Sequence, residues 1–235
     1  MKHPTPPIEW ADDHIRIIDQ TQLPADVHII EIRSSAQAVD AIQRLAVRGA
    51  PALGAFGALA LVVALDESQP TSLKQALVRL EECRTLIGDA RPTAVNLRWA
   101  VDRVIDKAIR TSDDLASLRA AVLSEAHAVA AEDEAACDEI GRLGHELLRD
   151  ATAIGTHCNA GRLATAGMGT ALAPMYAKAQ AGEPLQVFAS ETRPLLQGAR
   201  LTAWELEDAG IDVTVVPDGA MASTVLSGQV DAYIV

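Results

Sequence analysis

From about residue 150 onward, short apolar runs alternate with stretches of helical composition. The apolar runs predict strands at 151–155, 185–189, 212–216 and 232–235, and the stretches between them predict helices ending near 181, 209 and 226. A strand, a helix and a second strand in this order connect through a right-handed crossover and build a parallel sheet. Residues 149–235 are therefore expected to form a Rossmann-like α/β domain that is cut short at its fourth strand.

The first part of the chain predicts a different domain, over residues 1–148. Two runs rich in β-branched residues, 15–20 and 27–30, flank Leu23 and Pro24 and predict a short β-hairpin or small sheet. Apolar residues at helical spacing then predict helices at 35–47, 52–65, 73–87, 94–108, 115–136 and 140–148. The fold expected for the whole chain is thus α/β, with a mostly helical N-terminal domain. Acidic residues between 125 and 139 are interpreted as a solvated helix face.

Composition excludes several classes of protein. Hydrophobic residues make up 49% of the 235 residues, which is enough for a core and argues against disorder. The net charge of −12, without any long basic run, argues against nucleic-acid binding. The longest apolar run, 50–65, is interrupted by proline and glycine and is too short to span a membrane, so no membrane partner is expected.

Cysteine usage and the N-terminus indicate the compartment. Cys83, Cys137 and Cys158 are too few and too far apart for a disulfide framework or a zinc site. Residues 1–4 are not followed by the apolar segment of a secretory signal. A reducing cytoplasm is therefore expected, and no metal site is predicted.

The turn 156–161, after the first strand of the expected parallel sheet, presents a thiol, an imidazole and an amide. Ligands of open α/β sheets bind beyond the carboxyl ends of the strands. A helix is expected to follow directly, and its N-terminus would favour an anion. Alternative interpretations are a buried, inert cysteine for Cys158 and a hydrogen-bonded structural role for His157.

Four further junctions are candidate binding sites. The polar cluster 191–200 follows the second strand, and Asp218 follows the third. In the helical part, both Arg48 and Arg91 precede a proline at the start of a helix. An arginine beside the free backbone N–H groups of a helix start suits a phosphate, although an ordinary surface loop is the alternative.

Four of these segments, taken in order, resemble the family of S-methyl-5-thioribose-1-phosphate isomerases. That family belongs to a wider group with the regulatory subunits of translation initiation factor 2B. The segments are 47–52, 91–97, 156–161 and 191–202, and the resemblance runs from about residue 10 to 235. The first two segments favour the isomerases over the regulatory subunits.

The resemblance implies the isomerisation of 5-methylthioribose 1-phosphate to 5-methylthioribulose 1-phosphate in methionine salvage, without a metal or nucleotide cofactor. It implies that Cys158 is the catalytic thiol. It also implies that the protein is a homodimer. The substrate that it implies is a small phosphorylated sugar. The residues implied to bind this substrate are Arg48, Gly49, Ala50, Arg91 and Gln197.

The family's second catalytic residue is an Asp in a Gly-Ala-Asp-Arg motif that comes just after a strand like 232–235, and an Asn-Lys pair beyond it contacts substrate. Both motifs fall past Val235. Ring opening and hydrogen transfer between C1 and C2 need a group on each side of the sugar. The 235-residue chain alone is therefore expected to be inactive and the full-length protein active.

Two alternatives remain open. A related isomerase could act on ribose 1,5-bisphosphate or 5-deoxyribose 1-phosphate; Trp10, Ile15 and the few basic residues of the N-terminal part favour the methylthio substrate. A non-catalytic regulatory subunit would be expected to lack the thiol and the phosphate-binding arginines. The presence of Cys158, Arg48 and Arg91 argues against it.

Overall fold

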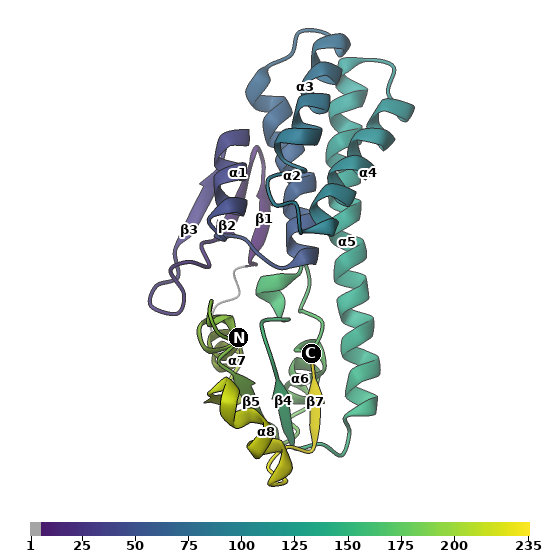
Figure 1. The fold of residues 1–235 in the computed structure, drawn as a ribbon. Coiled ribbons are helices and arrows are strands. Elements are labelled where there is room, and N and C mark those ends of the chain that lie inside the picture. The colour runs from purple at the N-terminus through teal and green to yellow at the C-terminus, as the bar shows by residue number, and fades with distance from the viewer. Residues whose placement is uncertain (1–5) are drawn as a thin grey trace. The chain divides into compact units, whose positions relative to one another are not determined.

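The computed structural model describes residues 6–235. Residues 1–4, on which the argument against a secretory signal was based, lie outside the described residues. The chain forms two compact units (Figure 1). The helical unit comprises residues 6–21 and 27–133, and the α/β unit comprises residues 22–26 and 134–235. The domain boundary near residue 148 stays a prediction.

The helical unit contains a small antiparallel sheet of order β1-β2-β3. Its strands are β1 (Ile8–Ala11), β2 (His14–Ile18) and β3 (Ile29–Ile32). The predicted small sheet is confirmed, although its second predicted strand begins two residues later and β1 was missed. Strand β1 has only four residues, and all of them are half-buried. Such a strand shows no clear alternation of apolar and polar residues from which it could be predicted. The register pairs Ile15 with Ile32, both of which are buried in the core of this unit.

Helices make up the rest of this unit: α1 (Ser35–Gln43), α2 (Ala50–Ser68), α3 (Leu73–Leu86), α4 (Val95–Thr111) and the first part of α5 (Leu115–Leu147). The hydroxyls of Ser34 and Ser72 cap α1 and α3 by accepting a backbone N–H three residues on. The prediction of two helices at 115–136 and 140–148 is wrong. The intervening residues contain neither proline nor glycine, so one helix continues through them.

Helix α2 is the centre of the helical unit. Its 19 residues are long and apolar enough to cross a membrane, contrary to the length argument made from the sequence. However, 78% of its most apolar stretch is buried inside the structure, as expected of a core helix. Glycines let it approach α4, because a Cβ at Gly57 would collide with Leu97 and one at Gly54 would lie 3.3 Å from the Asn96 carbonyl oxygen.

The α/β unit contains the predicted parallel sheet, in the order β6-β5-β4-β7. Its strands are β4 (Ala153–Thr156), β5 (Gln186–Ser190), β6 (Asp212–Val216) and β7 (Ala232–Ile234), and its shorter helices are α6 (Ala173–Gln180), α7 (Ala203–Asp208) and α8 (Asp218–Leu226). Ile154 and Val187, paired across β4 and β5, lie in a buried cluster with Leu206 of α7. Since β4 and β5 are neighbours, the segments that follow their carboxyl ends meet.

Two of the connections in this unit differ from the prediction. No helix follows the turn after β4 directly: a short 3₁₀ turn at Arg162–Ala164 comes first, and α6 begins only at Ala173. The chain instead folds back on itself, because Gly169 pairs with Gly161 and has φ +104°. The expected anion site at a helix N-terminus directly behind this turn is therefore wrong. Between β5 and α7, a π-helical turn at Gly198–Thr202 replaces the expected start of a regular helix.

Candidate active site

Cys158 lies just beyond the carboxyl end of β4, in a constrained backbone conformation. Its φ of +66° is in the left-handed region, which is uncommon for a residue other than glycine. Its N–H donates to Thr192 Oγ1 at 2.9 Å, and its carbonyl oxygen accepts from Thr202 Oγ1 at 2.7 Å. Both threonines belong to the connection between β5 and α7. The half-buried thiol is thus held from two sides at the edge of the sheet.

Gln197 is in direct contact with this thiol. Its Nε2 donates to Cys158 Sγ at 3.2 Å. The contact depends on the next residue, because a Cβ at Gly198 would collide with the carbonyl oxygen of Ser190 at the end of β5. The structure therefore brings together two residues that the sequence assigned to one site, 39 positions apart.

The description of a buried, inert cysteine, considered as an alternative for Cys158, applies instead to the other two cysteines. Cys83 and Cys137 are both almost fully buried, whereas Cys158 is partly accessible. Burial raises the pKa of Cys83 to about 11, which keeps it protonated at neutral pH. Of the three thiols, Cys158 is the one placed to meet a ligand.

Asp218, at the start of α8, holds the polar cluster that follows β5. Its carboxylate accepts from the N–H of Thr192 at 2.9 Å and of Arg193 at 2.8 Å. The bond from Arg193 and then that from Thr192 lower the pKa of Asp218. The expected hydrogen-bonded role of His157 is not observed, since this residue is exposed and its ring makes no hydrogen bond within residues 6–235.

A buried polar layer beneath the Cys158 turn was missed in the sequence. Glu205 of α7 is 0% exposed and accepts from the Asn159 amide and from the Leu163 N–H, the latter at 3.4 Å. Burial raises the pKa of Glu205 to about 7, although the charge of Arg162 and these hydrogen bonds oppose the rise. One signal was available: Glu205 stands four residues after buried Leu201, within the apolar stripe.

In the helical unit, the predicted residues Arg48, Gly49 and Ala50 form the start of α2. Gly49 is the N-cap residue with φ +97°, a conformation that favours glycine, and Ala50 is the first helical residue. No side chain caps this N-terminus. Arg48 is only 8% exposed. Backbone N–H groups and the helix dipole favour an anion at such a position.

Arg91 stands before the start of α4 and is near the same end of the helical unit. Gly54 and Gly57 of α2 contact residues 96 and 97 of α4 in the same order, so the two helices run in the same direction. Their N-termini therefore lie at one end, and no side chain caps either of them. Half-buried Arg91 forms no ion pair with any residue of 6–235.

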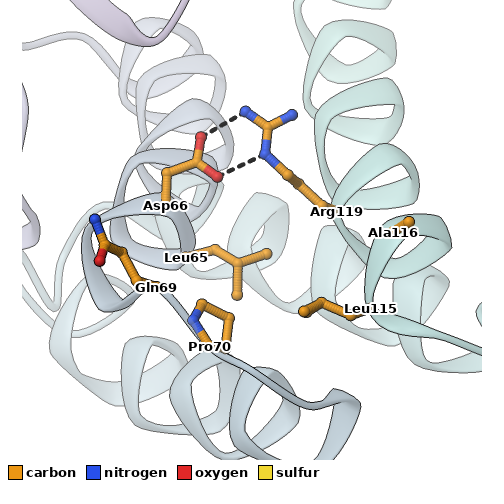
Figure 2. A pocket seen from close by; sticks show the side chains of 7 residues that line it. All are labelled: Leu65, Asp66, Gln69, Pro70, Leu115, Ala116 and Arg119. Carbon is orange, nitrogen blue, oxygen red and sulfur yellow. Dashed lines mark hydrogen bonds and ion pairs between the residues drawn. The ribbon is translucent and has the colours of Figure 1, made fainter.

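A pocket of about 430 Å³ lies at the opposite end of α2 (Figure 2). It is lined by Leu65, Asp66, Gln69, Pro70, Leu115, Ala116 and Arg119. Arg119 Nε and Nη2 each donate to the Asp66 carboxylate at 2.6 Å, so the two charges of the pocket neutralise each other. Fifteen or so helical residues separate this pocket from Gly49, roughly 25 Å along the axis, so it is not part of the candidate site.

The predicted residues thus fall into two groups, each compact within its own unit. Arg48, Gly49, Ala50 and Arg91 lie at the paired helix starts of the helical unit, and Cys158 and Gln197 lie at the sheet edge of the α/β unit. Among residues 6–235, no three His, Cys, Asp or Glu side chains are placed to hold a metal ion.

Comparison with protein families and curated proteins gives consistent matches. The model of the initiation factor 2 subunit family (IF-2B) matches residues 46–235. A 5-deoxyribose 1-phosphate isomerase of Moorella thermoacetica is 49% identical over all of this chain and 67% of its own length. A methylthioribose-1-phosphate isomerase of Gemmatimonas aurantiaca is 48% identical over 98% of this chain and 67% of its own.

Solved structures show the same likeness. The 5-methylthioribose 1-phosphate isomerase of Pyrococcus horikoshii superposes with a TM-score of 0.91 at 33% identity, over 97% of this chain and 64% of that one. Subunit delta of the translation initiation factor eIF-2B from A. fulgidus gives a TM-score of 0.88 at 39% identity, over 97% and 66%. The chain therefore spans about two thirds of the length of the relatives that it matches.

Proposed function

This chain belongs to the initiation factor 2 subunit family, and we propose that it is part of an aldose–ketose isomerase that converts 5-methylthioribose 1-phosphate into 5-methylthioribulose 1-phosphate in methionine salvage. Relatives named methylthioribose-1-phosphate isomerase support this proposal, at 48% and 44% identity for two of them. The observation on which it chiefly depends is the Cys158 thiol, which is partly accessible and hydrogen-bonded to Gln197 at the carboxyl edge of the sheet.

In this reaction Cys158 acts as one of the groups that exchange a proton with the sugar as hydrogen moves between C1 and C2. A thiol can both donate and accept a proton, as general acid–base catalysis requires. The hydrogen bond from Gln197 Nε2 fixes the direction in which the sulfur faces. Neither metal nor nucleotide cofactor is required by this chemistry.

Gln197 also has a free group for substrate. Its Oε1 is buried and accepts no hydrogen bond from residues 6–235. A buried acceptor without a donor is unfavourable, so a hydroxyl group of the sugar that donates to it would gain binding energy. This favours Gln197 as a substrate-binding residue beside the thiol.

The phosphate is proposed to bind to the helical unit. Two uncapped helix N-termini at one end of the α2–α4 pair offer backbone N–H groups, and Arg48 and Arg91 offer positive charge. Glycine at position 49 removes the side chain that would obstruct a ligand next to the first N–H groups. Arg48, Gly49, Ala50 and Arg91 are accordingly proposed to bind the phosphorylated end of the substrate.

A second candidate substrate is 5-deoxyribose 1-phosphate, favoured by the relative of that name at 49% identity. The two sugars share the reacting atoms and differ at C5. The test is to measure kcat/KM of the complete gene product with both. A clear preference for the methylthio sugar supports the first proposal, a preference for the deoxy sugar supports the second, and no turnover of either supports a non-catalytic role like that of initiation-factor subunits.

Cytoplasmic location and a homodimer are also proposed. Cys83, Cys137 and Cys158 are all free, which suits a reducing compartment. Apolar side chains of the α/β unit, including Leu226 and Tyr233, are exposed and could be covered by a second copy. Light scattering of the complete gene product tests the dimer: a monomer mass would contradict it.

A further inference from the structure

A buried carboxyl group lies directly beneath the turn that presents Cys158. Glu205 accepts from the side-chain amide of Asn159 on one oxygen and from the N–H of Leu163 on the other. Both donors belong to the chain that follows Cys158. A buried carboxylate is tolerated only where its oxygens are hydrogen-bonded, so these bonds restrict where this part of the chain can lie.

Two routes lead from Glu205 to Cys158. The first is covalent, because Asn159 is the next residue. The second passes through Thr202, whose Oγ1 accepts from Asn159 Nδ2 at 3.2 Å and donates to the Cys158 carbonyl oxygen at 2.7 Å. A left-handed backbone at a residue other than glycine persists only where its surroundings hold it, and these bonds do so for Cys158.

The fit between the turn and the carboxyl group is close. A Cβ at Gly161 would collide with both oxygens of Glu205, so the backbone can come this near only as glycine. Asp208, three residues further along the same face of α7, has a different partner: it accepts from Arg162 Nη2 at 2.5 Å. One helix thus presents two buried acids, and Glu205 is the one that bonds the side chain next to the thiol at its Oε1.

We propose that Glu205 is a positioning residue for Cys158, acting through Asn159 and Thr202 to keep the thiol in its left-handed turn facing the ligand side of the sheet. Its effect on turnover rests on the proposed isomerase function. Its effect on the thiol does not, because the accessibility of Cys158 can be measured without substrate.

The experiment compares the complete gene product with its Glu205→Gln variant. Glutamine has the same shape but turns one acceptor into a donor, which then opposes Asn159 or Leu163. Losing one buried hydrogen bond is worth about tenfold in local opening, so alkylation of Cys158 by iodoacetamide, followed on its peptide by mass spectrometry, should be about tenfold faster. In turnover, kcat should fall by about tenfold while KM changes less than about threefold.

Asp208→Asn is the matched control, because it also removes a buried charge from α7 but keeps the carboxyl group of Glu205 and the hydroxyl of Thr202 that bond Asn159. It should leave the alkylation rate of Cys158 at the wild-type value. Equal acceleration in both variants, or none in a folded Glu205→Gln variant, would overturn the proposal.

Thr202→Val is a second, milder variant, which removes only the hydroxyl between Asn159 and the Cys158 carbonyl. It should also accelerate alkylation, and a wild-type rate would show that Thr202 is not part of the route. If the wild-type protein turns over neither sugar, the proposed function fails, while the alkylation rates still decide the role of Glu205.

Discussion

Glu205 should make the stability of the α/β unit depend on pH, and its replacement by glutamine should remove that dependence. Burial raises the pKa of Glu205 from 4.5 to about 7, against the charge of Arg162. Asp208 and the phenol of Tyr176 also face this region. An acid whose pKa is raised by folding holds its proton longer in the folded state than in the unfolded state. The free energy of unfolding therefore falls as pH rises from about 4.5 through 7.

The expected size of the effect follows from the two pKa values. One pKa unit corresponds to about 1.4 kcal/mol, so full ionisation of Glu205 costs roughly 3 kcal/mol, of which about 2–3 kcal/mol appears between pH 5 and pH 8. Glutamine does not titrate. Its misplaced donor costs about 1–3 kcal/mol at every pH, so the stability difference between wild type and variant should shrink by about 2–3 kcal/mol over this range.

Urea unfolding followed by the fluorescence of Trp204 measures the free energy of unfolding of the α/β unit. Trp204 is next to Glu205 in α7, whereas Trp10 and Trp99 belong to the helical unit and would be replaced by Phe in all variants. Glu207→Gln, an exposed change in the same helix, is the control and should leave the pH dependence unchanged. A difference between wild type and Glu205→Gln that stays constant from pH 5 to pH 8, within the extrapolation error of about 10–15%, would refute the reasoning.

Four further outcomes are expected of the complete gene product. Cys158→Ser should lower kcat by about 10²–10⁴-fold with little change in KM, because a hydroxyl exchanges protons poorly at neutral pH. Gln197→Ala should lower kcat/KM by roughly 10–100-fold, since it removes both the bond to the sulfur and the free acceptor. Gly198→Ala should destabilise the α/β unit by about 3 kcal/mol or more in urea unfolding, because its Cβ collides with the Ser190 carbonyl. Arg91→Ala should raise KM by about 10–100-fold, because a charge-assisted bond to phosphate is lost.

Matched controls exist for the last two variants. Gly219→Ala adds a methyl group in open space on α8 and should leave stability unchanged. Arg110→Ala removes an exposed charge from the other end of α4 and should leave KM at its wild-type value. An Arg110→Ala effect as large as that of Arg91→Ala would mean that net charge, and not a phosphate site, determines KM.

Local pattern was sufficient for most of the secondary structure. The strands of the parallel sheet are short apolar runs between turn residues, and helix starts such as that of α2 were marked by glycine and proline. The pattern failed where its period is ambiguous. Helix α5 was divided because a run of acidic residues interrupts its apolar stripe, and the four residues of β1 are too few to show an alternation.

The contact between Cys158 and Gln197 was within reach of the sequence, although 39 residues separate the two. Parallel strands place their carboxyl ends at one edge of the sheet, so polar residues that follow neighbouring strands must come near one another. This rule predicts that the two residues lie near each other, but it does not predict their hydrogen bond. The contact requires the π-helical turn at Gly198 and the left-handed backbone of Cys158, and neither has a signature in residue type other than the glycine.

Glu205 shows what the rule cannot provide. In the sequence it is one of many acidic residues, and a helix ending in Glu-Leu-Glu-Asp looks solvated. Its importance arises from depth: the fold buries it completely against a turn that only glycine at 161 allows to approach. Cys158 and Gln197 lie beyond strand ends and can be located by topology, whereas Glu205 lies one layer below them, and its contacts depend on the packing of α7 against the Cys158 turn. Sequence motifs therefore do not reveal the buried residues that support a site. A conservative substitution of such a residue, Glu205→Gln, should affect turnover although it changes no motif residue.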